Sequence, residues 1–112
     1  MNSNEKPNLV VIELTPGNIR NNHIYLATVM NFFPSSCIGG SSIEACAPQM
    51  LELDIGFGEP IETDIDGSPK KKIFRKRAWV RQFFERNELK PGDKVVIERT
   101  REFRYHIYPT RD

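Results

Sequence analysis

The segment KIFRKRAWVRQFFERNELKPGDKVV, Lys72–Val96, decides the fold of this chain. Its centre predicts one amphipathic helix over Ala78–Asn87, because Trp79 and Phe83 lie four residues apart on one face. The sequence Leu-Lys-Pro-Gly then ends the helix. The alternating segment Asp93–Arg99 that follows is typical of a half-buried strand. A single helix next to strands predicts a small, mostly β domain.

Short apolar runs separated by turn residues make up most of the remaining chain. Val29–Phe33 is expected to form one or two helical turns, and Ser35–Ala47 a loop. In a chain of 112 residues, the number of expected strands indicates one domain, built as a small barrel or sandwich. The seven segments predicted to be strands are Leu9–Leu14, Asn22–Ala27, Met50–Ile55, Pro60–Ile65, Lys70–Lys76, Asp93–Arg99 and Phe103–Tyr108.

Charge is separated along the chain, although the net charge is only +1. The 23 residues Glu44–Asp66 hold seven acids and no base, whereas Lys70–Arg86 holds eight Lys or Arg residues and one acid. Cations interleaved with aromatic residues suit a surface that neutralises phosphates. A solvated helix face with ordinary basic residues explains the same charge equally well. On the first interpretation, we expect the carboxylates of Glu44–Asp66 to face away from nucleic acid.

The sequence offers little for catalysis, for a cofactor or for a membrane. The acids of Glu52–Asp66 alternate with apolar residues, as on a solvated strand face, and no acid-x-Lys triplet lies among them. Neither Cys37 nor Cys46 lies in a zinc or nucleophile motif. No apolar run approaches the roughly 20 residues of a membrane span. We therefore expect a protein that is not an enzyme, has no cofactor or metal, and is cytoplasmic, or nucleoid-associated if bacterial.

A polar run, Arg20–His23, stands at a predicted transition from a loop to a strand. Its residue types suit base edges, since Arg pairs with guanine and Asn with adenine. In the strand that follows, alternation places Ile24 and Leu26 toward the core and Tyr25 on the opposite face with His23. Alone, this run is only a polar turn. It gains weight because a second polar segment, Gly67–Arg77, is present in the chain.

Two segments together resemble the B-three DNA-binding superfamily. The first, LTPGNIRNNHIYLATVMNFFP at Leu14–Pro34, resembles the family's opening strand, polar arm, second strand and helical turn that closes on Phe-Pro. The second, Lys72–Val96, resembles its basic strand, its Trp-bearing helix and its closing Asn-Leu-Lys-x-Gly-Asp turn. The first segment is more similar to the effector domains of bacterial restriction endonucleases than to plant transcription factors. His23 and Thr28 stand where the plant pattern has Arg and Lys, so the recognised DNA sequence does not follow from the resemblance.

The resemblance implies a mostly β, seven-stranded open pseudobarrel with one or two short helices. This domain would occupy residues 9–112, after a disordered lead-in at residues 1–8. The resemblance also implies sequence-specific binding of double-stranded DNA, without catalysis, by two arms that enter the major groove from its two sides. The first arm is Asn18–His23, and the second arm is Asp66–Arg77.

The expected interface divides into base contacts and phosphate contacts. Phosphate contacts set the register on DNA but carry little sequence information. Base contacts are expected from Arg20, Asn21, Asn22, His23, Arg75 and Arg77. Phosphate contacts are expected from Lys70, Lys71, Lys72, Lys76 and Arg81. The remaining predicted DNA-binding residues are Tyr25, Thr28 and Ser68. Alternation along the basic strand leaves open which of its residues face DNA.

Several roles are open from the sequence. A swapped-hairpin regulator, which shares the Gly-Asp turn, would bind DNA as an obligate dimer. A single-strand or RNA-binding β-barrel would need aromatic residues exposed on a sheet face. We expect instead a monomer that binds duplex DNA, acting as a transcription regulator or as the targeting partner of a separately encoded nuclease.

Overall fold

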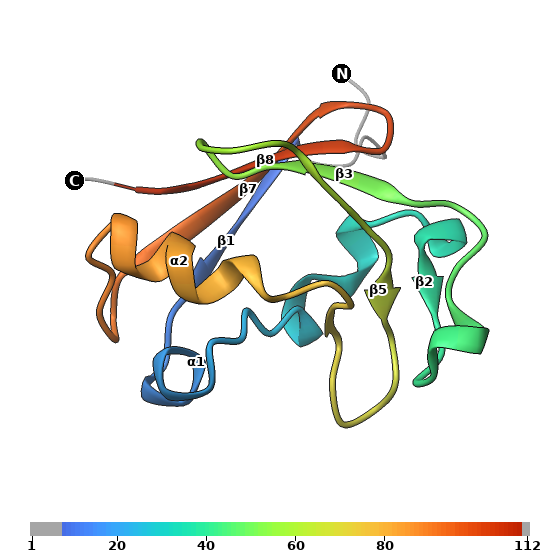
Figure 1. Cartoon of the computed structure of the whole chain (residues 1–112), viewed down its shortest axis with the longest axis horizontal. Helices are drawn as coiled ribbons and strands as arrows, with labels where there is room; N and C mark the ends of the chain where they lie inside the picture. The colour runs from blue at the N-terminus through green and yellow to red at the C-terminus, as the bar shows by residue number, and fades with distance from the viewer. Residues whose placement is uncertain (1–7, 111–112) are drawn as a thin grey trace, which may run out of the picture.

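The computed structural model describes residues 8–110, and its largest part is a five-stranded sheet (Figure 1). The strands lie in the order β1-β7-β8-β3-β4. Neighbouring strands are antiparallel except β3 and β8, which run parallel. Their bounds are β1 Leu9–Glu13, β3 Leu51–Asp54, β4 Ile61–Thr63, β7 Lys94–Arg101 and β8 Arg104–Pro109.

A second sheet consists of three strands of two residues each, in the order β2-β5-β6. Strand β2 runs parallel to β5, and β5 runs antiparallel to β6. Only Asp64 separates β4 from β5, so the chain passes directly from the large sheet into the small one. The bounds of these strands are β2 Ile38–Gly39, β5 Ile65–Asp66 and β6 Ile73–Phe74.

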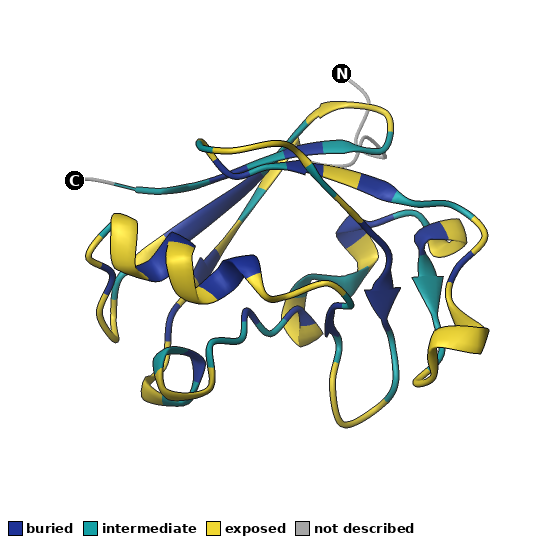
Figure 2. Cartoon of the chain, viewed as in Figure 1, coloured by how far each residue is buried: buried dark blue, intermediate teal, exposed yellow. Residues whose placement is uncertain are grey.

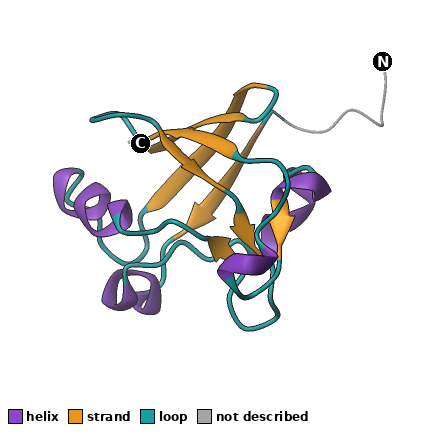
Figure 3. Ribbon diagram, turned by 45° about the vertical axis from the view of Figure 1, so that its right-hand side comes forward, coloured by secondary structure: helices purple, strands orange, loops and turns teal. Residues whose placement is uncertain are grey.

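Short helices lie below the large sheet, on the side away from the turn of the β7–β8 hairpin (Figures 1 and 3). The first α-helix begins at a proline and the second carries a wide apolar stripe, as their sequences require. The α-helices are α1 Pro16–Asn21 and α2 Trp79–Arg86, and the 3₁₀ turns are η1 Ala27–Phe32, η2 Ser35–Cys37 and η3 Ile43–Ala45.

The core lies between α2 and the inner face of the large sheet, where buried residues of both elements face each other (Figure 2). On α2, the rings of Trp79 and Phe83 lie 6.0 Å apart, and Trp79 also contacts Phe74 of β6 at 6.1 Å. Phe33 connects this group to the large sheet through Tyr105, with ring centroids 5.3 Å apart. Each fully buried aromatic side chain contributes about 1.5–3 kcal/mol. The aromatic residues of the basic segment therefore hold the second arm to the core.

The prediction of a mostly β chain is confirmed, but its strand count is wrong. The described residues form eight strands in two mixed sheets rather than seven strands, and no closed barrel is present among them. The helix predicted at Ala78–Asn87 is α2, and the two final predicted strands form the β7–β8 hairpin. The segment Ser35–Ala47, predicted to be a loop, contains η2, β2 and η3. A strand of two residues among short polar residues leaves no pattern in the sequence.

Two predicted strands in the arms are corrected. Asn22–Ala27 forms no ladder, although the predicted alternation is confirmed, with Ile24 and Leu26 buried. Lys70–Lys76 is a strand only at β6, because Lys72 has a positive φ of 52° that interrupts extended backbone.

The predicted lead-in falls almost entirely outside the described residues. Of residues 1–8, only Asn8 is described, and its carbonyl accepts a hydrogen bond of 2.7 Å from the Arg99 amide. Asn8 is therefore part of the edge of the large sheet rather than of a disordered lead-in. Among the described residues, no helix has the length and apolar character needed to cross a membrane.

Candidate nucleic-acid interface

The first arm is helical, where the sequence predicted a turn. Thr15 caps α1: its hydroxyl accepts a bond from the Asn18 amide, and Asn18 Oδ1 accepts one from the Thr15 amide at 2.7 Å. This capping box, with Pro16 at the first helical position, starts the helix. It also buries Asn18, which is only 2% exposed. Asn18 is thus a structural residue of the arm, whereas Arg20 and Asn21 are exposed at the end of α1.

Asn22 ends α1 in the left-handed conformation, with φ 54° and ψ 50°. This turn directs the chain into His23, whose amide donates to the Asn18 carbonyl at 3.0 Å. His23 Nδ1 lies 3.0 Å from the hydroxyl of Tyr25. Both side chains are half-buried, whereas Ile24 between them is buried. The two polar rings of this segment therefore form one unit.

The second arm begins with a tight polar turn that the small sheet holds in place. Asp66 Oδ1 accepts bonds from the Ser68 amide at 3.0 Å and from its hydroxyl at 2.7 Å. Gly67 donates to the Gly39 carbonyl, and a Cβ at Gly67 would lie 2.5 Å from Ile38 Cγ2. Only glycine fits so close to β2. Beyond this turn the chain forms the exposed loop that projects from the lower side of the molecule in Figure 1.

The two arms meet, although more than 40 residues of chain separate them. The amide of Leu26, just after the first arm, donates to the carbonyl of Lys72 at 2.8 Å. Burial lowers the pKa of His23, and the positive charges of Arg77 and Lys71 lower it further. Three cationic or polar groups from both arms therefore share one region of the surface.

The prediction that Arg75 contacts a base is corrected by its position in the structure. Its Nε donates to Asp64 Oδ1 at 2.7 Å, and its Nη2 donates to Asp64 Oδ2 at 3.0 Å and to the Gly40 carbonyl at 2.7 Å. Its Nη1 donates to the Ser42 carbonyl at 3.2 Å. Only 16% of the side chain is exposed. Arg75 holds the protein together and is not available to read a base.

Two acids of the acidic stretch support the second arm from within. Asp64 directly precedes β5, Asp66 begins the second arm, and both are buried and bonded to residues of that arm. The expectation that the acids of Glu44–Asp66 face away from nucleic acid stays a prediction. Burial raises the pKa of the Asp64 carboxyl, but the bonds from Arg75 and the Ala47 amide outweigh this, and the pKa lies below its usual value. The pKa of Asp66 is lowered in the same way, with the Ser68 bonds outweighing burial. Both carboxylates are charged structural supports.

The cations that remain exposed on the second arm are Lys70, Lys71, Lys76 and Arg77. Their backbone is supported from the core: the Thr63 hydroxyl accepts from the Lys76 amide at 2.9 Å, and Trp79 Nε1 donates to the Lys76 carbonyl at 2.7 Å. Lys72 is half-buried, with its Nζ 3.5 Å from the Pro69 carbonyl. The four exposed side chains can contact phosphates without any rearrangement of the core.

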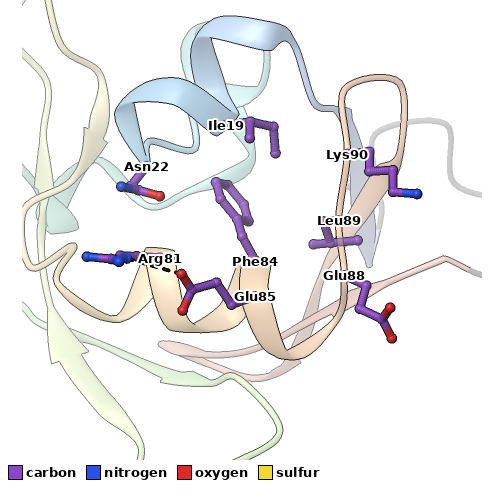
Figure 4. Close-up of a pocket in the computed structure, with 8 residues that line it drawn as sticks. All are labelled: Ile19, Asn22, Arg81, Phe84, Glu85, Glu88, Leu89 and Lys90. Atoms are coloured by element: carbon purple, nitrogen blue, oxygen red, sulfur yellow. Dashed lines mark hydrogen bonds and ion pairs between the residues drawn. The ribbon is translucent and has the colours of Figure 1, made fainter.

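Arg81 lies beside the first arm. It lines a cavity of about 310 Å³ between α1 and α2, together with Asn22 (Figure 4). Ile19, Phe84 and Leu89 form the apolar lining of this cavity. Arg81 pairs with Glu85 at 3.2 Å, and both side chains are largely exposed. An exposed pair of this kind contributes little to stability, so Arg81 can exchange Glu85 for a phosphate.

The structure brings His23 close to Lys71 and Arg77, and Asn22 close to Arg81. Of the other predicted residues, Ser68 is half-buried in the Asp66 turn, and Thr28 is exposed in η1. Sequence reasoning missed Asp64 and Thr63, whose polar atoms support the second arm, whereas it placed Asp66 in the turn that begins this arm. The role of Asp64 follows from the antiparallel pairing of β5 with β6, because this pairing places Asp64 opposite Arg75.

Comparisons with protein-family models, with curated proteins and with solved structures gave no match. Within residues 8–110, no three His, Cys, Asp or Glu side chains lie close enough together to hold a metal ion. Cys37 is buried, Cys46 is exposed, and both are free thiols. The function is therefore argued from the geometry of the two arms.

Proposed function

We propose that this protein binds double-stranded DNA in the major groove through the two arms, with sequence preference. The observation that supports this most is the meeting of the arms, where Leu26 bonds to Lys72 and His23 lies in the field of Lys71 and Arg77. A polar segment suited to base edges thus lies beside a set of exposed cations suited to phosphates. The fold proposed with this function is the open pseudobarrel of the B-three superfamily.

The proposed contacts divide between the arms. Arg20, Asn21, Asn22 and His23 would contact base edges from the first arm, with Arg77 from the second. Phosphates would be neutralised by Lys70, Lys71, Lys72, Lys76 and Arg81. Arg75 takes no part in this scheme because Asp64 holds its guanidinium group.

Duplex DNA is favoured over single-stranded nucleic acid by the placement of the aromatic residues. A single-strand binder stacks bases on exposed aromatic side chains. Phe74, Trp79 and Phe83 are buried in the core instead, at no more than 7% exposure each. The aromatic residues of the basic segment therefore support the surface from below rather than forming it.

Binding measurements with single variants test the proposal. Sites are first selected from a random duplex library, and affinity is then measured for a selected and for an unselected duplex. Arg20→Ala should weaken the selected duplex by roughly fivefold or more, and the unselected duplex far less. Lys71→Ala should weaken both alike. A matched control, Arg101→Ala, removes an exposed cation from the β7–β8 hairpin on the opposite side of the molecule and should change neither.

Two outcomes would contradict the proposal. Selection that returns no preferred sequence would remove sequence preference, and an Arg101→Ala loss equal to that of Lys71→Ala would move the binding surface away from the arms. Competition by single-stranded DNA at equal concentration would favour the single-strand alternative instead.

A further inference from the structure

The side-chain chemistry of His23 is set by a neighbour. Its Nδ1 lies 3.0 Å from the hydroxyl of Tyr25, and the two rings meet edge to face with centroids 5.3 Å apart. The Tyr25 hydroxyl is therefore the hydrogen-bond partner of one of the two ring nitrogens. Among the described residues, none forms a hydrogen bond with the other nitrogen, Nε2, which is available to a ligand.

The direction of the bond to Tyr25 determines which nitrogen carries the proton. A neutral imidazole has one N–H donor and one acceptor nitrogen, and the partner of one nitrogen sets the role of the other. A phenol O–H is a better donor than an imidazole N–H, and a ring nitrogen is a better acceptor than a phenol oxygen. Tyr25 therefore donates to Nδ1, and the proton of His23 lies on Nε2.

The neutral form of His23 is the relevant one near pH 7. Burial lowers the pKa of its imidazole below 6.5, and the charges of Arg77 and Lys71 lower it further. An imidazolium would carry a proton on both nitrogens, so that Tyr25 could no longer donate to Nδ1. In the neutral form, the hydroxyl selects one tautomer out of two.

The backbone around His23 holds this pair in a fixed place. The His23 amide bonds to the Asn18 carbonyl, and the buried side chain of Ile24 follows directly. Two residues later, the Leu26 amide bonds to the Lys72 carbonyl of the second arm. His23 and Tyr25 are thus fixed between the end of α1 and the second arm, without the cost of ordering them on binding.

We propose that Tyr25 is a positioning residue that fixes His23 as a hydrogen-bond donor, so that the first arm selects a guanine at one position of its DNA site. This inference rests on the proposed function and deepens it. In the major groove, guanine presents two adjacent acceptors, O6 and N7, whereas adenine combines an acceptor with a donor and cytosine presents only a donor. A donor at Nε2 therefore favours guanine, whose two acceptors lie side by side, over adenine and thymine, which present one acceptor each, and it rejects cytosine.

The tautomer is measured first, on the protein without DNA. Long-range ¹H–¹⁵N correlation spectra of ¹⁵N-labelled protein distinguish a protonated from an unprotonated ring nitrogen. In the wild type, we expect Nε2 of His23 to be protonated and Nδ1 to be bare, and in Tyr25→Phe we expect both tautomers. A proton on Nδ1 in the wild type would overturn the inference before any DNA is added.

The base preference is measured on sites selected from a random duplex library. Each guanine of the selected site is replaced in turn by 7-deazaguanine, which lacks the N7 acceptor. At one guanine, the wild type should lose roughly three- to tenfold in affinity, the worth of one hydrogen bond. His23→Ala and Tyr25→Phe should lose little from the same replacement. As a matched control, Tyr108→Phe removes a hydroxyl that bonds to Glu98 at 2.9 Å on the large sheet, and it should behave like the wild type.

The outcomes separate the inference from the proposed function. If wild type and Tyr25→Phe bind DNA with the same base preference and the same 7-deazaguanine losses, the inference is wrong while duplex binding stands. If His23→Ala retains the full loss, another residue contacts that guanine and the inference is again wrong. If the wild type binds no duplex, the proposed function fails, and the inference fails with it.

Discussion

His23 illustrates how much of a residue's chemistry depends on its neighbours. Alternation along residues 22–27 correctly predicted that Ile24 and Leu26 are buried, and His23 is more exposed than either. Alternation could not predict the Tyr25 bond or the two cations from the second arm, because those depend on segments brought together by the fold. The same holds for Arg75, which looks like a DNA contact in the sequence and is an internal ion pair in the structure.

The pKa of His23 provides a test of the contact between the arms that needs no DNA. Burial and the charges of Arg77 and Lys71 place the folded pKa below 6.5. Because the unfolded chain then takes up a proton more readily, this histidine lowers stability as the pH falls from 6.5 through the folded pKa. Arg77→Gln should raise the pKa of His23, as measured by NMR titration of its ring protons.

The control for this titration is Arg101→Gln, on the far hairpin, which should leave the His23 titration unchanged. An unchanged midpoint in Arg77→Gln would show that the second arm does not lie close to His23 in solution. The meeting of the arms would then no longer support the proposed interface.

Among the elements, those with a long apolar pattern were predictable and the short ones were not. The apolar stripe of α2 was visible in the sequence as Trp79, Val80, Phe83 and Phe84. The alternation in residues 93–108 likewise predicted the two strands of the β7–β8 hairpin. In α1, Pro16 and Gly17 are residues typical of a turn, although Thr15 and Asn18 at a spacing of three are also a helix-start signal. Strand β2 has two residues and pairs in parallel with β5, so no local pattern marks it.

The small sheet depends on one ion pair that connects four segments. Asp64 accepts from Arg75 and from the Ala47 amide at 2.7 Å, while Arg75 donates to the carbonyls of Gly40 and Ser42. Asp64→Asn should lower the free energy of unfolding by about 3 kcal/mol at pH 7, because it leaves Arg75 without a buried countercharge. Urea denaturation measures this loss. The control Glu62→Gln, at an exposed position of β4, should change stability by less than about 0.5 kcal/mol.

The same carboxyl sets an acid dependence of stability. Its folded pKa lies below its unfolded value, so its stabilisation is present above about pH 3.9 and is lost as the pH falls through the folded pKa. Asp64→Asn should remove this part of the acid dependence. Equal stability of Asp64→Asn and wild type at pH 7 would mean that the pair does not hold the second arm.

Across the whole molecule, the separation of charge along the sequence corresponds only in part to a separation in space. Some exposed cations lie on or beside the two arms, and others lie at the end of α2, in the turn after it and on β7. The first group is Arg20, Lys70, Lys71, Lys76, Arg77 and Arg81, and the second is Arg86, Lys90, Lys94 and Arg101. Two of the acids in the acidic stretch, Asp64 and Asp66, are buried within the support of the second arm. Exposed acids of the large sheet, such as Glu52, pair with cations there, as with Arg104 at 3.1 Å. This arrangement would orient the molecule as it approaches a polyanion.

The salt dependence of DNA affinity tests the central claim most directly. Five cations on or beside the arms are proposed to neutralise phosphates: Lys70, Lys71, Lys72, Lys76 and Arg81. If five or six phosphates are neutralised, the logarithm of the binding constant should fall with the logarithm of salt concentration with a slope of about −5. Lys71→Ala should reduce that slope by about 1, and Arg101→Ala should leave it unchanged. A binding constant that does not change with salt would contradict DNA binding through these arms.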